Sequence, residues 1–554
     1  MIKIIRSNKV AFYALIFIWF LAGSVIFNHT IVNAQTQSSQ PDNQRYLRLF
    51  TEVLMRIRQT YVDELAIDEL ITSAIDGMLS EMDPHTTFFR PDDFREFTTS
   101  TMGEFGGLGI TIDRRGDFIT VVSPMEGTPA YRMGIQAGDR IIRADDNDMI
   151  GITTDEALRL MRGTPGTRVV IGIDRPGVEG VLEFDIIREI IRISSIPHAF
   201  KLDNGIGYIR IRQFNAQTTM DLRRALDRLE QEGIRGLLID LRFNPGGLLN
   251  EAVDTVNEFI GPNRLVVSTR GRMRESNRQY NTRFNRMRTG YPVMALINEA
   301  SASAAEIFAG SLQDWDKGLV VGKTSFGKGS VQQLYPLSDG YGLKVTISRY
   351  YINSGRGIHR EENDRILRGE RVTQEERDEI ARQNEQHRYY TVNGRVVFGG
   401  GGVVPDIEIE QDVMTRLDRE IRRMNLFFDF SVDYFAKYGD SITLDFKPSD
   451  AMVGDFLEFA RSKGLTYEQA ELDSSMNFIM VSLTRDIIGK KFGETEAYKA
   501  AIPLDSQLTE ALRLFDRFPT LEQMFEYVEQ RRQNGEQGQE NGEQGTGNRR
   551  GRRG

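Results

Sequence analysis

The chain has 554 residues, of which 40% are apolar and 27% are charged, a composition typical of a globular protein with several domains. Its formal net charge of −9 gives no electrostatic reason to expect nucleic-acid binding. It contains no cysteine, which excludes disulfides, thiolate nucleophiles and cysteine-based metal sites. No two of its five histidines stand three or four residues apart, so a histidine metal centre is not indicated either.

The first 34 residues are typical of an export signal. Three basic residues come first, an apolar run without charge follows, and "IVNAQ" then offers small residues where a signal peptidase prefers to cut. The run is also long enough to serve as an uncleaved membrane anchor. Both interpretations predict an exported protein of the periplasm or cell envelope, anchored to the inner membrane in the second case.

Helical periodicity extends from about residue 43 to residue 82, where "DPHTTFFRP" (Asp83–Pro91) ends it with two prolines. The pattern then changes to short β-branched runs such as "GLGITID" and "RVVIGID", separated by turn residues and one helical piece. From about Ser194, strands alternate with amphipathic helices, which indicates an α/β domain. A polar helical stretch at 360–390 is predicted to be a surface insertion.

Residues 412–554 divide into two parts. Residues 412–530 return to helical periodicity, and their many aromatic side chains predict a local helical core. From Arg531 the composition has low complexity and predicts disorder. We therefore expect a multidomain α/β protein with these parts: an export segment (1–34), an N-terminal helical region (41–97), a β-rich domain (98–188), an α/β core (189–411), a helical C-terminal domain (412–530) and a tail (531–554).

The stretch "GKTSFGKGSVQ" (Gly322–Gln332) permits three interpretations. A phosphate-binding loop would need Ser or Thr after Lys328, where Gly329 stands, and should open a helix, whereas a strand-like segment follows. A Ser-x-x-Lys pair of Ser325 and Lys328 would need a helical turn, which the glycines disfavour. In the third interpretation, the loop delivers Lys328 to a serine elsewhere.

"NEASASAAEIFAG" (Asn298–Gly310) offers such a serine. Its small residues follow a strand and open a helix, whose N-terminus supplies free N–H groups for a developing oxyanion. From spacing alone, Ser301 and Ser303 compete for the role of nucleophile. Helix capping explains both serines equally well.

Several linked stretches together resemble one family. They are "YVDELAIDELITSAIDGMLSEMDPHTTFF", "GGLGI" with "GTPAYRMGIQAGDRI", "LLIDLRFNPGGLL", "INEASASAAEIFAGSLQD", "VGKTSFGKGSVQ" and "GVVPDIEI". In this order they resemble the C-terminal processing proteases, the tail-specific serine peptidases of family S41 that contain a PDZ domain, over residues 45–410. Two small departures are Ala300, where the family often has Gly, and "YYINSGRGIHR", which differs from the usual Thr-Pro-Ser-Gly-Arg form.

The resemblance implies an α/β Ser-Lys protease core. It implies that Ser303 is the nucleophile and Lys328 the base, supported by Gln332. It further implies that the oxyanion binds N–H groups of Gly246 or Gly247, in the "NPGG" turn, and of Ala304. An exposed lysine, with a pKa of ~10.4, is protonated at neutral pH, so this mechanism requires burial to lower the pKa of Lys328.

The β-rich domain is similar to a PDZ module. By this resemblance, "GGLGI" would bind a terminal carboxylate through consecutive main-chain N–H groups, while the peptide adds as a strand to the sheet. The N–H donors would be those of Gly107, Leu108, Gly109 and Ile110. Arg162 is the matching candidate for sensing the docked peptide, although a surface salt bridge explains it equally well. Taken alone, Gly-Leu-Gly is commonly a turn.

The leading hypothesis is therefore a serine endopeptidase of the cell envelope that docks the C-terminal tails of proteins and cleaves them through an acyl-enzyme. The alternative is a PDZ adaptor without catalytic activity on the same fold. No metal or organic cofactor is implied, and no nucleic acid. The family also permits a homodimer, formed through helices at either end of the chain.

Overall fold

The structure is a computed structural model that describes residues 40–547, so the predicted export segment lies outside the described residues. The chain divides into two units, Met1–Asp83 and Pro84–Gly554, and each is described by itself. The first unit contains α2 (Gln40–Thr60) and α3 (Ile67–Ser80), which matches the predicted helical periodicity. Among the helices of residues 40–547, none combines the length and apolar character needed to cross a bilayer.

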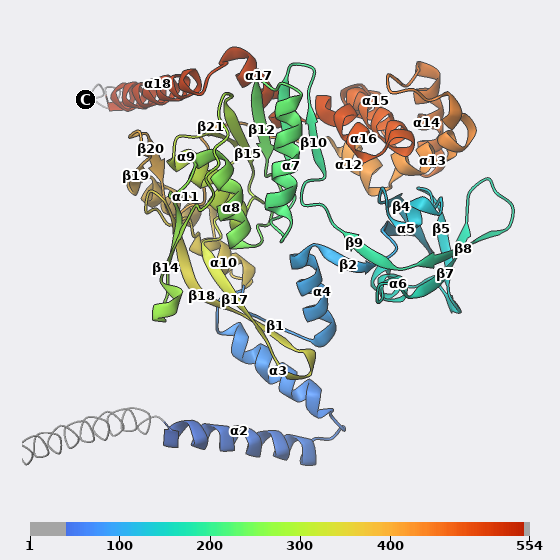
Figure 1. The fold of residues 1–554 in the computed structure, drawn as a ribbon, viewed down its shortest axis with the longest axis horizontal. Coiled ribbons are helices and arrows are strands. Elements are labelled where there is room, and N and C mark those ends of the chain that lie inside the picture. The colour runs from blue at the N-terminus through green and yellow to red at the C-terminus, as the bar shows by residue number, and fades with distance from the viewer. Residues whose placement is uncertain (1–39, 548–554) are drawn as a thin grey trace, which may run out of the picture. The chain divides into compact units, whose positions relative to one another are not determined.

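The β-rich domain is built on an antiparallel sheet in the order β3-β4-β5-β7-β8, with β6 paired to β5 (Figure 1). Its strands and helices are β3 (Ile110–Arg115), β4 (Phe118–Pro124), α5 (Pro129–Arg132), β5 (Arg140–Ala144), β6 (Asn147–Asp148), α6 (Thr154–Met161), β7 (Arg168–Asp174) and β8 (Val181–Ile187). Alternate strand residues point inward and form a closed apolar core, which includes Leu108, Val121 and Ile171. A separate pair, β2 (Glu104–Gly107) with β9 (Glu189–Arg192), lies where the chain enters and leaves this domain.

The centre of the α/β core is a six-stranded sheet in the order β10-β11-β12-β15-β16-β21, parallel except for β10. The strands are β10 (His198–Lys201), β11 (Ile206–Arg210), β12 (Gly236–Asp240), β15 (Val293–Ile297), β16 (Leu319–Gly322) and β21 (Ile407–Glu408). The inner strands β12 and β15 are buried along their whole length, because helices cover both faces of the sheet.

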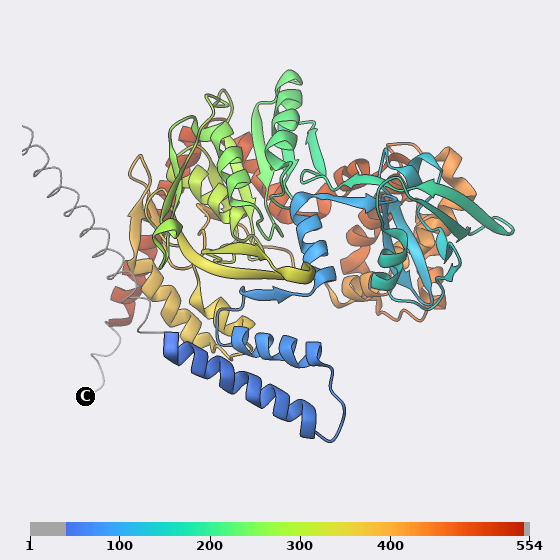
Figure 2. The same cartoon turned by 60° about the horizontal axis from the view of Figure 1, so that its bottom comes forward.

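One face of this sheet packs on α7 (Thr218–Gln231), α8 (Leu249–Ile260) and α9 (Ala304–Asp314), and Figure 2 shows the same elements in a turned view. The opposite face packs on α17 (Ser506–Arg517) and α18 (Leu521–Gly547). The alternation of strand side chains decides which residue faces which layer, so Ile239 contacts the first layer and Leu238 the second.

A second, antiparallel sheet flanks the core, in the order β1-β18-β13-β14 with β17 on β18. Its strands are β1 (Thr87–Phe89), β13 (Leu265–Arg270), β14 (Arg278–Asn281), β17 (Ser330–Pro336) and β18 (Gly342–Ile352). α4 (Pro91–Met102) connects β1 to the β-rich domain. The predicted polar insertion forms α10 (Glu361–Leu367) and α11 (Gln374–Gln386), followed by the hairpin β19 (Arg388–Tyr390) and β20 (Val396–Phe398).

The C-terminal helices do not form one separate body, which differs from the predicted division. Four of them enclose an aromatic core of their own: α12 (Arg416–Arg423), α13 (Leu426–Tyr438), α14 (Asp450–Ser462) and α15 (Gln469–Phe492). After α16 (Glu494–Ala501), however, α17 and α18 bury their apolar residues on the central sheet. α18 also continues to Gly547, into the range predicted to be disordered, although this range contains five glycines, which disfavour a helix.

Candidate active site

Three loops meet at the carboxyl ends of neighbouring parallel strands, which is where α/β sheets usually place their functional residues. The turn 243–247 follows β12, the segment 298–303 follows β15, and the loop 323–329 follows β16. These loops contain the predicted oxyanion glycines, the two candidate serines and the candidate lysine, respectively.

The hydroxyl of Ser301 is committed to the structure of these loops. Ser301 is fully buried, and its Oγ donates to the carbonyl of Leu241 (2.9 Å) while it accepts the N–H of Asn298 (2.9 Å). Ser301 therefore joins the end of β12 to the end of β15. Ser303, by contrast, is only half-buried and stands at the N-cap position of α9.

The backbone of Ser303 is strained. Its φ of 55° and ψ of −113° lie where residues other than glycine rarely occur, at a cost of about 1–3 kcal/mol. Strain of this kind persists only where the surroundings impose it, and it is concentrated at functional sites. The strained conformation of Ser303 lies between the end of β15 and the start of α9.

The buried carboxyl of Glu306 connects Ser303 to the lysine loop. Its Oε2 accepts the main-chain N–H of Ser303 (2.7 Å) and the main-chain N–H of Lys328 (2.9 Å). Its Oε1 accepts the N–H of Gly327 (2.7 Å) and the hydroxyl of Ser325. Burial raises the pKa of Glu306 above its ordinary value, and these four hydrogen bonds oppose that shift.

Tyr350 makes a second connection between the same two residues. Its buried hydroxyl lies 3.1 Å from the carbonyl oxygen of Ser303 and 2.7 Å from that of Lys328, so its single proton is shared between them. Burial and the nearby charge of Glu306 raise the pKa of Tyr350 well above its ordinary value, so the hydroxyl remains a donor. Glu306 and Tyr350 thus fix the main chains of Ser303 and Lys328 beside each other.

The 243–247 turn lies against Ser303. A Cβ atom added to Gly246 would come within 2.7 Å of the Ser303 Cβ and 2.9 Å of the Ala304 nitrogen, so only glycine fits there. The N–H of Gly246 donates to Asn244 Oδ1 (2.8 Å). Gly247 is exposed, and within residues 40–547 no acceptor is assigned to its N–H or to that of Ala304.

The side chains of Lys328 and Gln332 are both half-buried. Residues 324–329 belong to no helix, so the geometry needed for a Ser325–Lys328 pair within one helical turn is absent from this loop. Nor does the loop open a helix that could bind phosphate, because β17 follows it. Gln332 Nε2 donates to Ser330 Oγ (2.9 Å) and to Thr346 Oγ1 (3.2 Å).

The predicted peptide-docking loop stands beside a free sheet edge. Gly107 ends β2, Gly109 has a φ of 78°, and Ile110 begins β3, which is an edge strand of the β-rich domain. Leu108 is buried in the domain core. The loop is held in place by main-chain bonds in which its carbonyls accept the N–H groups of Met125 and Ala130.

Arg162 contacts α4. Its guanidinium lies 3.5 Å from Glu96 and over the ring of Phe105 (4.9 Å). Both charged side chains are partly exposed, so the ion pair itself is worth little. The salt bridge that explains Arg162 without a sensing role is therefore present, and it also joins the β-rich domain to α4.

Glu306 and Tyr350 are two site residues that were not predicted from the sequence. A signal for Glu306 was present, because Ser303-Ala-Ala-Glu306 has the spacing of a capping box, in which the acidic side chain bonds the N-cap main chain. Tyr350 is 47 residues from Ser303 along the chain, and nothing in the local pattern of β18 indicates its contact.

Comparison with known proteins agrees with this architecture. Residues 205–366 match peptidase family S41, and residues 120–175 match the PDZ domain. The chain is similar to a carboxy-terminal-processing protease of Bartonella bacilliformis, with 37% identity over 62% of this chain and 79% of that protein. It is also similar to a carboxyl-terminal-processing protease of Synechocystis sp., with 32% identity over 62% of this chain and 85% of that protein.

Among solved structures, the chain is similar to a photosystem II D1 C-terminal processing protease, with 27% identity, a TM-score of 0.32, and coverage of 56% of this chain and 90% of that one. The identity and coverage of the two curated relatives establish the family. The chain belongs to the carboxy-terminal processing proteases, the serine peptidases of family S41 that carry a PDZ domain.

Proposed function

We propose that Ser303 and Lys328 form the catalytic dyad of this serine peptidase. The observation that carries the proposal is the double connection between them: one carboxylate oxygen of Glu306 binds both main-chain N–H groups, and one hydroxyl of Tyr350 binds both carbonyls. Ser303 is preferred to Ser301 because the Ser301 hydroxyl is buried and already bonded, whereas Ser303 is accessible and strained.

In the proposed mechanism, the neutral amine of Lys328 takes the hydroxyl proton of Ser303 as Ser303 Oγ attacks the scissile carbonyl. The ammonium group then gives this proton to the leaving amine when the C–N bond breaks, which leaves an ester on Ser303. Water, deprotonated by the same amine, hydrolyses that ester. Gln332 supports Lys328 with an amide, which adds no charge and so does not favour the protonated lysine.

The oxyanion of the tetrahedral intermediate is proposed to bind the N–H groups of Gly247 and Ala304. Gly247 is preferred to Gly246 because the Gly246 N–H already donates to Asn244 and Gly246 is buried. The N–H of Ala304 belongs to the first residue of α9, where the helix dipole also favours negative charge. Such donors stabilise the transition state without needing to reorganise.

The PDZ domain is proposed to dock the C-terminal tail of a protein substrate. The carboxylate would bind the loop residues 107–110, and the tail would pair with the open edge of β3 beside α6. Arg162 is proposed to sense the docked tail through its contact with α4. The export of the chain to the cell envelope remains a proposal that rests on the sequence of residues 1–34.

The test uses a protein substrate with a free C-terminal tail and the same substrate with an amidated C-terminus. We expect wild type to cleave the free form faster, because the amide removes the carboxylate that the docking loop would bind, and Ser303→Ala to cleave neither. Cleavage by Ser303→Ala at the wild-type rate would refute the dyad. Equal rates on the two substrates would refute the docking.

A further inference from the structure

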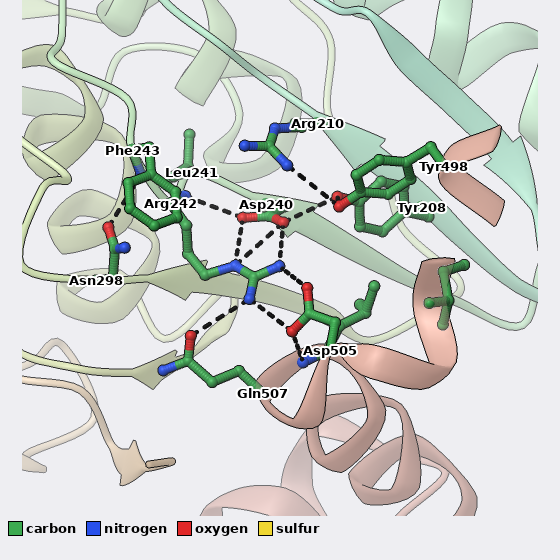
Figure 3. A network of polar contacts seen from close by, with 12 residues as sticks. Tyr208, Arg210, Asp240, Leu241, Arg242, Phe243, Asn298, Tyr498, Asp505 and Gln507 are labelled. Carbon is green, nitrogen blue, oxygen red and sulfur yellow. Dashed lines mark hydrogen bonds and ion pairs between the residues drawn. The ribbon is translucent and has the colours of Figure 1, made fainter. Parts of the chain in front are cut away.

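A buried polar network joins the C-terminal helices to the end of β12, directly before the 243–247 turn (Figure 3). At its centre is Arg242, which is 6% exposed. Its guanidinium lies between Asp240, on the same strand end, and Asp505, the N-cap residue of α17 (Figure 3). Of the three charged groups that contact one another directly, two come from β12 and its end, and the third comes from a segment about 260 residues later in the chain.

All five N–H donors of Arg242 have acceptors. Nε and one N–H of Nη2 donate to Asp240 (3.0 and 2.7 Å). The other N–H of Nη2 and one of Nη1 donate to the two carboxylate oxygens of Asp505 (2.6 and 2.8 Å). The last N–H lies 3.3 Å from Gln507 Oε1. Three of the five donors thus depend on α17.

The charge balance agrees with this geometry. Burial disfavours the charged form of Arg242, but the charges and hydrogen bonds of Asp240 and Asp505 outweigh burial and raise its pKa. Burial likewise raises the pKa of Asp240, but Arg242 outweighs it and the net pKa is lowered. Without Asp505, the buried guanidinium would keep one carboxylate and lose its bidentate partner on the other side.

The side chain of Arg242 points toward α17 because side chains alternate along β12. Leu238 faces the layer of α17 and α18, so Asp240 and Arg242, at two-residue steps from it, face the same layer. Residues between them face the other layer. Fixing the guanidinium therefore fixes the direction in which the chain leaves the sheet.

The residues that follow Arg242 lead directly to the candidate oxyanion donor. Phe243 has a φ of 59° and donates its N–H to Asn298 Oδ1 (3.0 Å), a contact visible in Figure 3. The carbonyl of Asn244 accepts the N–H of Ala302 (2.9 Å), next to Ser303. Arg242 is thus the anchor at the start of a strained turn whose other end lies against Ser303.

We propose that Asp505 is a positioning residue for catalysis: it acts through Arg242 to hold the 243–247 turn in the conformation that aims its N–H at the oxyanion. The C-terminal segment that carries Asp505 is then a required part of the active-site scaffold. This inference rests on the proposed function, because it assigns a purpose to the turn that the dyad mechanism uses.

The test compares Asp505→Asn with a matched control, Asp516→Asn, in the full chain. Asparagine keeps an oxygen for the N-cap bond to Leu508 but removes the charge opposite Arg242. Asp516 lies on the same helix and pairs with Arg235, which precedes β12, at the end of the strand far from the site. The two variants therefore make the same chemical change at opposite ends of β12.

For Asp505→Asn we expect kcat to fall about tenfold, with KM within about twofold of wild type. The reason is that a misplaced N–H donor stabilises the transition state less but does not change the binding of the substrate. We expect Asp516→Asn to retain the wild-type kcat. Faster hydrogen exchange in residues 241–248 of Asp505→Asn only would accompany the loss. Asp505→Glu keeps the charge and should have an intermediate kcat.

The proposal is overturned if Asp505→Asn has the kcat of wild type, or if both variants lose kcat equally, which would indicate a general loss of packing of α17. Ser303→Ala is measured in the same series. If Ser303→Ala is inactive while Asp505→Asn behaves like Asp516→Asn, the inference alone fails. If Ser303→Ala cleaves normally, the proposed function fails as well.

Discussion

Replacing Glu306 with glutamine should disconnect the nucleophile from the lysine loop. The carboxyl accepts four hydrogen bonds, two at each oxygen, and all four come from the main chain or side chains of residues 303 and 325–328. An amide keeps one oxygen but places an NH₂ group, which is a donor, at the other position. With NH₂ at the Oε2 position, the main-chain N–H groups of Ser303 and Lys328 face a donor; with NH₂ at the Oε1 position, the N–H of Gly327 does, while the hydroxyl of Ser325 can turn to accept.

The expected size of the effect follows from these contacts. Hydrogen bonds to a charged group contribute about 1.5–3 kcal/mol each, so the loss of one or two bonds should lower the free energy of unfolding by about 1.5–6 kcal/mol. Typical domains have only about 5–15 kcal/mol in total, so the variant should fold but with much less stability. Because the lysine loop moves away from Ser303, we also expect kcat to fall about 100-fold or more.

The assay is urea unfolding together with kcat on a tailed peptide, measured well below the new unfolding midpoint. Glu299→Gln is the matched control, since it makes the same change on the exposed part of the same loop, four residues before Ser303, and should behave as wild type. Wild-type stability and kcat in Glu306→Gln would refute the argument that this carboxyl holds Ser303 and Lys328 together.

Lys328, Gly246 and His198 can each be tested by substitution. Lys328→Arg should be as inactive as Lys328→Ala in a peptidase assay, because a guanidinium cannot be deprotonated; activity in the arginine variant would exclude the dyad. Gly246→Ala should fold but lose most kcat, because the new methyl group would come within 2.7 Å of the Ser303 Cβ; a normal kcat would show that the turn can move away. Burial, with Arg210 and Arg212, lowers the pKa of His198 from 6.5 to about 4. Between these pH values, His198 is therefore protonated in the unfolded chain but neutral in the folded one. As the pH falls across that range, His198 should lower the free energy of unfolding by about 3 kcal/mol. In His198→Phe, the free energy of unfolding measured in urea should depend less on pH in this range, and an unchanged pH dependence would contradict the assignment.

The sequence was sufficient for most of the fold because its local patterns agree with the long-range packing. The composition of Leu237–Leu241 predicts a buried strand, which is β12 (Gly236–Asp240) in the structure, and the small residues up to Ser303 predict the start of a helix, which is α9. The polar insertion was predicted for the same reason, since its charged residues allow no buried face.

The position of the last two helices could not be predicted in the same way. The amphipathic pattern of α17 shows that one face is buried, but it does not say against what. Leu508 and Phe515 fit a local helical core as well as they fit the central sheet, and only the structure assigns them to the sheet.

The candidate site was predictable only in part for a related reason. Spacing left Ser301 and Ser303 equivalent, and the hydrogen bonds that commit Ser301 to Leu241 involve a residue 60 positions away. The hydrogen bonds of Tyr350 with Ser303 and of Asp505 with Arg242 also join residues far apart in the chain. Such contacts leave no periodic signal in a single sequence.

Identification of the acylated residue tests the Ser303–Lys328 dyad directly. Wild type and Lys328→Ala are each mixed with a tailed peptide substrate, quenched in acid within a single turnover, digested and analysed by mass spectrometry. In wild type we expect an ester on Ser303 that carries the N-terminal part of the substrate, and in Lys328→Ala we expect no such ester. An acyl group on any other residue, or equally rapid acylation of Ser303 without Lys328, would contradict the dyad.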